Sequence, residues 1–324
     1  MIASHLSAPV LWTLAGVLGV LAAATVAVFV LARRRPAAAT EELRARMRSW
    51  WAIVLLFSFA LVLSRTAAIV LLGFVSFLAL KEYLSLIPTR RADRRVLLWA
   101  YLSIPVQFYW VGIGWYGMFV IFIPIYMFLF LPMRLVLIGE TQGFLRAVGT
   151  LHWGLMTTVY SISHAAFLLV LPADGNPVAG PGFAGGFAEA SGAGLLLFLL
   201  ILTEANDVAQ YVWGRMLGRR KVIPRVSPNK TWEGLIGGLA TTAALSLLLA
   251  PLLTPFAPGH AAAVGLLIGA AGFIGDVTVS ALKRDLGVKD SGSLLPGHGG
   301  VLDRLDSLTY TAPLFFHYVR YFYF

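Results

Sequence analysis

The chain has 324 residues, of which 59% are hydrophobic and 12% charged, with a mean hydropathy of +0.81. Soluble domains carry about 25% charged residues, so this composition indicates an integral membrane protein. The net charge of +10 does not indicate a nucleic-acid partner, because the basic residues cluster between apolar runs. The absence of cysteine excludes disulfides and thiolate chemistry.

The N-terminal segment predicts one span followed by a surface helix. Ala8–Ala32 has no basic region before it and runs for about 25 residues, which favours a spanning helix over a cleavable signal. Arg33, Arg34 and Arg35 then place the following segment on the inner side. Thr40–Arg48 reads as a short charged helix with Thr40 as N-cap, lying on the inner membrane surface.

The rest of the chain alternates between apolar runs and polar loops. The runs expected to span are Trp50–Leu63, Ala67–Leu80, Val96–Val111, Tyr116–Leu131, Leu151–Leu171, Gly194–Thr203, Gly234–Pro255, Ala261–Val279 and Leu305–Val319. The first two are short and are alternatively one broken element. Asp174–Ala193 is rich in Gly, Pro and Ala and lacks Lys and Arg, which is typical of an outer loop.

These runs predict an all-α polytopic membrane protein with about ten transmembrane helices. Placing both termini outside puts 23 of the 25 Lys and Arg residues on the inner side, with Arg65 and Arg320 as the exceptions. We therefore expect a multi-pass protein of the cell inner membrane whose polar site faces the cytoplasm. Three parts are predicted: an N-terminal helix with a juxtamembrane segment (1–49), a helical bundle (50–172) and a catalytic domain (173–324).

The polar residues are concentrated near the C-terminus. If the helix before Asp276 continues, Asp276, Ser280 and Lys283 lie on one face, and Asp303 and Asp306 can share a face in the same way. Carboxylates suit a hard divalent cation that bridges phosphates, and glycine-rich turns bring backbone N–H groups against phosphate oxygens. The residues therefore predict a metal-dependent phosphate-handling site at a membrane surface.

Two blocks of sequence carry a family resemblance. The first is Ser280-x-x-Lys283-Arg284 through Lys289-Asp290 to His298-Gly299-Gly300-x-x-Asp303-Arg304-x-Asp306. The second comprises Asn206-Asp207, Tyr211, Gly214-Arg215 and the run from Ser227 to Gly234. Together they closely resemble the CDP-diacylglycerol synthases, also called phosphatidate cytidylyltransferases. One departure is Gln210, because the family pattern Asp-x-x-Ala-Tyr has alanine before the tyrosine.

The resemblance implies transfer of CMP from CTP to phosphatidate, with Mg²⁺, possible involvement of a second cation such as K⁺, and a homodimer in the bilayer. It implies catalytic roles for Asp276, Asp303, Lys283 and Lys230, and metal ligation by Asp276, Asp303 and Asp306. Substrate contacts are expected from Asn206, Asp207, Ser227, Lys230, Ser280, Arg284, Lys289, Asp290, His298, Gly299, Gly300 and Arg304. A phosphate monoester is already ionised at pH 7, so no strong general base is required.

Several alternatives stay open at this point. Asn206 and Asp207 could cap or hydrate a broken helix, Glu82 could pair with Lys81, and the intramembrane histidines favour structural packing. The chain could use CTP on another lipid phosphate, such as an ether or isoprenoid lipid, or be a transporter. The lack of an internal repeat and the position of the polar residues at span ends weaken the transporter interpretation. Residues 1–48 are expected to be dispensable, since every candidate site residue lies beyond Leu195.

Overall fold

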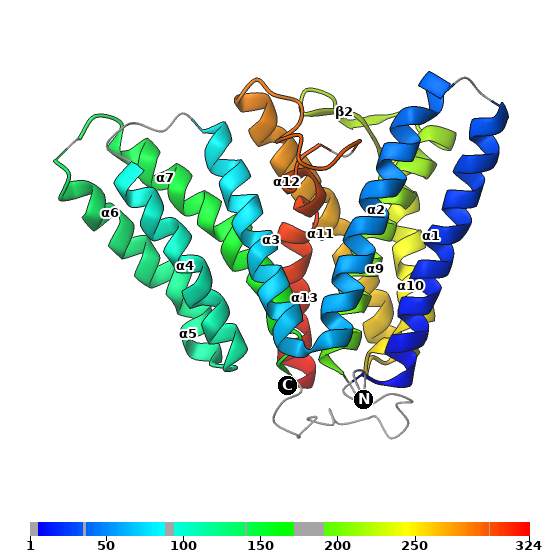
Figure 1. Ribbon diagram of the computed structural model, residues 1–324, viewed down its shortest axis with the longest axis horizontal. Helices are drawn as coiled ribbons and strands as arrows, with labels where there is room; N and C mark the ends of the chain where they lie inside the picture. Colours follow the sequence, from blue (N-terminus) through cyan, green and yellow to red (C-terminus); the bar gives the residue numbers. More distant parts are fainter. Residues whose placement is uncertain (1–5, 35–36, 88–93, 140, 172–190, 298) are drawn as a thin grey trace.

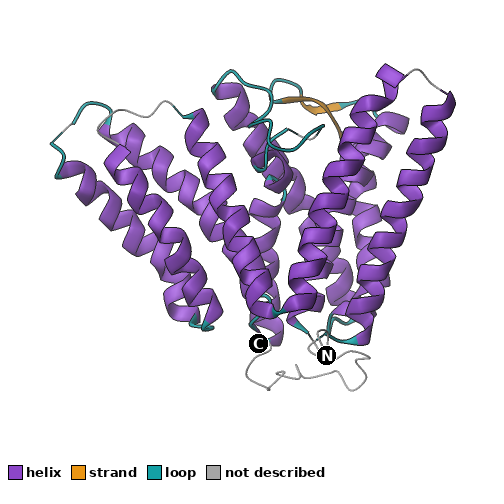
Figure 2. Cartoon of the chain, viewed as in Figure 1, coloured by secondary structure: helices purple, strands orange, loops and turns teal. Residues whose placement is uncertain are grey.

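The computed structural model describes residues 6–34, 37–87, 94–139, 141–171, 191–297 and 299–324. They form long helices standing side by side, with one small β-hairpin at one end of the bundle (Figures 1 and 2). Seven of the described helices are long and apolar enough to cross a membrane. The protein is therefore mainly helical with several candidate spans, while the count of ten stays a prediction. The expected outer loop at 174–193 falls mostly outside the described residues.

The first two helices differ from the sequence-based expectation. α1 (Ala8–Arg34) is followed by α2 (Ala37–Leu63), a single helix that includes the whole charged segment. The expectation of a separate surface helix at Thr40–Arg48 is wrong. No Gly or Pro interrupts Ala37–Leu63, so the backbone has no reason to break where the side chains change from charged to apolar. The Trp51 indole donates to Thr25 Oγ1 at 2.9 Å and ties the two helices together.

The next helices form one side of the bundle (Figure 1). Ser64 separates α2 from α3 (Arg65–Leu86), because its hydroxyl caps the new helix by accepting from Ala67 N at 3.0 Å. The elements that follow are α4 (Arg94–Gly112), α5 (Tyr116–Ile121), η1 (Phe122–Met127), α6 (Phe128–Val136), α7 (Phe144–Leu155), η2 (Met156–Tyr160) and α8 (Ser161–Phe167). As expected, His152, His164 and His317 pack against aromatic rings.

The C-terminal helices surround the polar residues. α9 (Gly192–Leu217) continues unbroken through the polar stretch that the sequence suggested as a break. Strands β1 (Lys221–Ile223) and β2 (Ser227–Thr231) pair antiparallel, so the basic segment between α9 and α10 is a hairpin. α10 (Trp232–Leu253), α11 (Pro258–Asp285), the short α12 (Leu302–Leu305) and α13 (Leu308–Tyr323) complete the chain.

The two ends of the bundle differ in character. The hairpin, the segment after α11 and the start of α2 lie at one end, whereas α1 begins and α13 ends at the other (Figure 1). The polar segments that are far apart in sequence therefore meet at a single end. We call residues 291–297 and 299–300 the glycine-rich loop; it lies at this end, between α11 and α12.

Candidate active site

A cluster of carboxylates lies where α9 and α11 meet the segment joining α12 to α13. Asp276 on α11 forms an ion pair with Lys230, from the end of β2, at 2.5 Å. Ser280, one turn along α11, donates to the other oxygen of Asp276 at 3.2 Å. Asp207 on α9 accepts a hydrogen bond from Ser307 Oγ at 2.8 Å. The spacing of Asp276 and Ser280 on one helical face is thus as predicted.

Asp306 lies beside the other two carboxylates. Its Oδ1 accepts from Ser307 N at 2.7 Å. The Asp306 carboxylate lies close enough to Asp276 and Asp207 for the three negative charges to repel one another. Three carboxylates therefore lie close together, and of the three only Asp276 forms an ion pair within the described part of the chain.

Close helix packing brings this cluster together. At Gly275 a Cβ atom would overlap the carbonyl oxygen of Asp306, so only glycine lets α11 approach the chain before α13. Asn206, which is fully buried, donates to Gly269 O at 3.3 Å and accepts from Thr242 at 3.2 Å. Asn206 therefore fastens α9 to α10 and α11. Because α9 is unbroken here, Asn206 does not cap a broken helix, and its contact with substrate stays a prediction.

One observation bears on whether a cation fits here. The Oδ1 atom of Asp207 is buried and has no hydrogen-bond partner among the described residues. Carboxylate oxygens are the ligands that Mg²⁺ takes in proteins, and a cation would satisfy this atom. Among the described residues, however, no three His, Cys, Asp or Glu side chains are grouped closely enough to hold a metal ion. The donor chemistry of Asp207, Asp276 and Asp306 fits a divalent cation.

Asp303 belongs to a second cluster, which has a different character. Its Oδ1 accepts from Lys283 Nζ at 2.7 Å, and its Oδ2 accepts from the backbone of Ser291 at 2.8 Å and Gly300 at 3.0 Å. Gly299 has φ +79°, and the side chain of any other residue at this position would place its Cβ against the same carboxylate. Burial alone would raise the pKa of Asp303, but the hydrogen bonds from Lys283, Gly300 and Ser291 hold it below its usual range. In this arrangement Asp303 and Lys283 fasten the glycine-rich loop to α11.

The remaining predicted residues lie around these clusters. Arg284 donates to the carbonyls of Val226 and Val288, both at 3.3 Å, and joins the hairpin to the end of α11. Four others lie nearby with side chains at least partly accessible to solvent: Ser227, Lys289, Asp290 and Arg304. His298 lies outside the described residues. Substrate contact by each of these residues stays a prediction.

The motif Ser-Pro-x-Lys-Thr-Trp-Glu-Gly divides into structural and site positions. Thr231 caps α10 by accepting from Gly234 N at 3.1 Å, and Glu233 accepts from the backbone of Arg219 at 3.0 Å and Arg220 at 3.2 Å. These contacts fix the hairpin against the helix. Lys230, just before the cap, is therefore held where it reaches Asp276.

Several residues of the site region escaped the sequence analysis because their partners are remote in sequence. On α2, Arg46 Nε donates to Gly297 O at 3.1 Å and Ser49 Oγ donates to Pro296 O at 2.8 Å. On α3, Glu82 accepts from Leu302 N at 2.9 Å, contrary to the suggested pairing with Lys81. The N-terminal half thus holds the glycine-rich loop through α2 and the start of α12 through α3. The expected dispensability of residues 1–48 conflicts with the contact made by Arg46.

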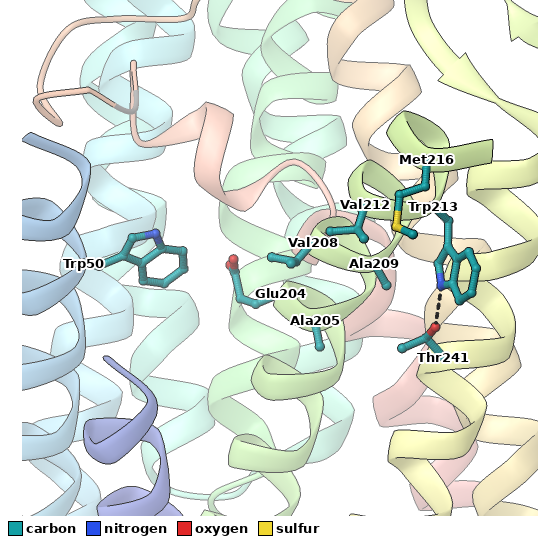
Figure 3. Close-up of a pocket in the computed structure, with 9 residues that line it drawn as sticks. All are labelled: Trp50, Glu204, Ala205, Val208, Ala209, Val212, Trp213, Met216 and Thr241. Carbon is teal, nitrogen blue, oxygen red and sulfur yellow. Dashed lines mark hydrogen bonds between the residues drawn. The ribbon is translucent and has the colours of Figure 1, made fainter. Parts of the chain in front are cut away.

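An open groove of about 540 Å³ lies along α9, between Trp50 of α2 and Thr241 of α10. Figure 3 shows Trp50 of α2 facing a row of α9 side chains, with Trp213 hydrogen-bonded to Thr241 of α10. The lining is apolar apart from a few groups, chief among them Glu204. Glu204 lies one helical turn before Asp207, whereas most of the other α9 residues that line the groove lie on a different face of the helix from Asp207.

Comparisons with known proteins identify the family of the chain. Residues 44–322 match the profile of the Cytidylyltransferase family, and the chain therefore belongs to that family. The resemblance drawn from the two sequence blocks is confirmed, and the protein is a nucleotidyltransferase. α1 lies outside the matched region.

Individual relatives show how similar the chain is to particular proteins. It is 47% identical over 288 residues to the uncharacterized protein YnbB of Escherichia coli, covering 89% of this chain and 91% of that one. It is 46% identical over 135 residues to the phosphatidate cytidylyltransferase of Haemophilus influenzae (40% and 46% of the two chains) and 42% over 176 residues to that of Brucella suis (50% and 64%). The chain thus spans about half to two thirds of the length of these two named enzymes.

Proposed function

We propose that this protein transfers CMP from CTP to phosphatidate, forming CDP-diacylglycerol and pyrophosphate. The observation that carries the proposal is the cluster of Asp207, Asp276 and Asp306 beside Lys230, at the end of the bundle where the polar segments meet. Family membership and the names of two relatives support the same activity.

The charges of the site suit the reaction. Phosphatidate attacks the α-phosphorus of CTP while pyrophosphate leaves, so two anions must meet. Mg²⁺ held by Asp207, Asp276 and Asp306 would neutralise phosphate charge when bound. Lys230, released from its pair with Asp276, is placed to bind a phosphate oxygen, while the Asp303–Lys283 pair holds the loop in position. No side chain needs to act as a strong base, because the attacking phosphate is already ionised.

The two substrates are expected to reach the site by different routes. Moving an acyl chain out of lipid costs roughly 0.8 kcal/mol per CH₂, so phosphatidate stays in the membrane. The apolar groove between Trp50 and α9 offers its chains a place on the helix that carries Asp207. CTP comes from water, past the exposed basic side chains of this end: Arg219, Arg220, Lys221, Arg225, Arg284, Lys289 and Arg304.

Placement in the cell follows from the same reasoning. We propose ten spans in the inner membrane, with this end in the cytoplasm and both termini outside. In this orientation the basic residues lie on the cytoplasmic side, and CTP can reach the site from the cytoplasm. A homodimer and a second cation such as K⁺ are further expectations that come from the family resemblance.

The deciding experiment is an assay of the purified protein with radiolabelled CTP and a panel of lipid phosphates. We expect Mg²⁺-dependent labelling of phosphatidate and no labelled protein in a rapid quench. Transfer only to an ether or isoprenoid lipid phosphate would replace the substrate, and a covalent cytidylyl-enzyme would replace the direct displacement. Absence of transfer to any lipid, with Asp276→Asn as the matched inactive control, would reject the function.

A further inference from the structure

The side chain of Gln210, on α9, lies inside the site without being part of the predicted machinery. It is 4% exposed, and its Oε1 accepts from Lys230 Nζ at 3.2 Å. It is also the position where the family pattern has alanine. The chain therefore places an additional buried amide against the lysine that pairs with Asp276.

The orientation of this amide follows from chemistry. Oxygen and nitrogen of a Gln side chain are hard to tell apart by shape, but an ammonium group has only donors. The oxygen must therefore face Lys230, and the NH₂ group must point elsewhere. That nitrogen is buried and has no hydrogen-bond partner among the residues that the structure describes. A buried amide donor left without an acceptor is destabilising, and a ligand that accepts from it removes this cost.

A second unpartnered atom lies one helical turn away. Asp207 and Gln210 are three residues apart on α9 and so face the same side of the helix. Asp207 Oδ1 lacks a donor or a cation, and Gln210 Nε2 lacks an acceptor. A ligand that carries both a cation and an anionic oxygen would satisfy both atoms. A metal-bound phosphate has this composition, and Lys230 beside it favours the anion.

The position of Gln210 is fixed by its neighbours. A Cβ atom on Gly238 of α10 would collide with Gln210 Cγ, so the two helices confine the side chain between them. Such confinement keeps the NH₂ group oriented before substrate arrives.

We propose that Gln210 Nε2 donates a hydrogen bond to a phosphoryl oxygen of a bound substrate and is a binding residue of this site. The inference rests on the proposed function, in which both substrates carry phosphates. The acceptor belongs either to the nucleotide or to the lipid phosphate, and the kinetic constants of the two substrates distinguish them.

The test compares variants that separate donation from support of Lys230. Gln210→Glu keeps the side-chain length and the acceptor for Lys230 but loses the donor. Gln210→Ala loses both the acceptor and the donor. If the alanine variant does not fold, Gln210→Met takes its place, since it also lacks both groups. A hydrogen bond to a charged group is worth about 1.5–3 kcal/mol, so we expect the KM for one substrate to rise at least about tenfold in both Gln210→Glu and Gln210→Ala. A rise for CTP assigns the nucleotide phosphate, and a rise for phosphatidate assigns the lipid phosphate.

The control is Gln107→Met. Gln107 is also a buried glutamine with one unpartnered amide atom, but it lies on α4, bonded to Phe119 and Ser163. This variant is expected to lose stability without a change in either KM. Wild-type KM values in Gln210→Glu, with a defect only in Gln210→Ala, would reduce Gln210 to a support for Lys230 and overturn the proposal.

Binding without turnover separates this inference from the proposed function. Inorganic pyrophosphate, CTP and a short-chain phosphatidate, each with Mg²⁺, should raise the unfolding temperature of the wild type, and Gln210→Glu should need about tenfold more of at least one of them. If the wild type transfers CMP to no lipid but this difference persists, the proposed function fails and the inference stands. If the wild type is active and the variant matches it in both KM values and in binding, the inference fails.

Discussion

Replacing Asp303 by Asn is expected to destabilise the glycine-rich loop before it affects metal binding. The carboxylate now accepts from Lys283 on one oxygen and from Ser291 and Gly300 on the other. Asparagine keeps the oxygen for the two backbone amides, which turns its NH₂ group toward the ammonium. Lys283, only 9% exposed, would then be a buried cation facing a donor.

The magnitude follows from the burial of the pair. Removing one partner of a buried ion pair costs about 3–5 kcal/mol, because the other charge is left uncompensated. We expect a loss of this size in the stability of the loop, measured by denaturant titration in detergent micelles and by hydrogen exchange of the Ser291 and Gly300 amides. Removing the stranded cation as well, in Lys283→Met with Asp303→Asn, should recover part of the loss. Asp285→Asn, at an exposed position of α11, is the matched control and should change stability by less than about 0.5 kcal/mol.

The acid dependence has a defined sign. The pKa of Asp303 is lowered in the folded state, so its contribution is complete above the unfolded value of about 4 and is lost as the pH falls through the lower folded value. An unchanged loop in Asp303→Asn, together with an increased Mg²⁺ requirement, would refute this reasoning and restore Asp303 as a metal ligand.

Three further outcomes are expected. Asp276→Asn should lower turnover by orders of magnitude with little effect on folding, and Lys230→Ala should mainly raise the KM for CTP; near-normal activity of Asp276→Asn at low Mg²⁺ would move the metal site elsewhere. Deletion of residues 1–48 should abolish turnover, and Arg46→Ala alone should lower kcat, whereas full activity of the deleted protein would show that the α2 contact is not needed. Single cysteines at Arg219 and Lys289, possible in this cysteine-free chain, should react only from the cytoplasmic side in oriented vesicles, and labelling from outside would reverse the topology.

The sequence predicted the helical class because hydropathy reports burial in lipid directly. It misplaced the course of α2 and α9, since polar side chains interrupt hydropathy without interrupting the backbone. Neither Thr40–Arg48 nor the polar stretch after Thr203 contains Gly or Pro, so both helices continue. Charge patterning signals where a helix meets water and not where it ends.

The site was predictable where residues are close in sequence and unpredictable where they are not. The shared face of Asp276 and Ser280 follows from helical periodicity, and the structure has it. The contacts of Ser49 and Glu82 join residues more than 200 positions apart, and no local pattern encodes such pairs. The sequence showed that Gln210 departs from the family pattern. The orientation of its amide could not be predicted, because it depends on the position of Lys230.

The tethering of the glycine-rich loop by α2 has a consequence for biosynthesis. Arg46 and Ser49 leave the ribosome about 250 residues before the carbonyl groups they bind. Because chains are made from the N-terminus at about 5–20 residues per second, α2 waits more than ten seconds for its partner. A nascent chain, or one ended by a premature stop codon soon after residue 276, consequently has Asp207 and Asp276 but no fixed loop. The site is thus assembled only when the chain is complete, so partly synthesised protein in the membrane is expected to be inactive.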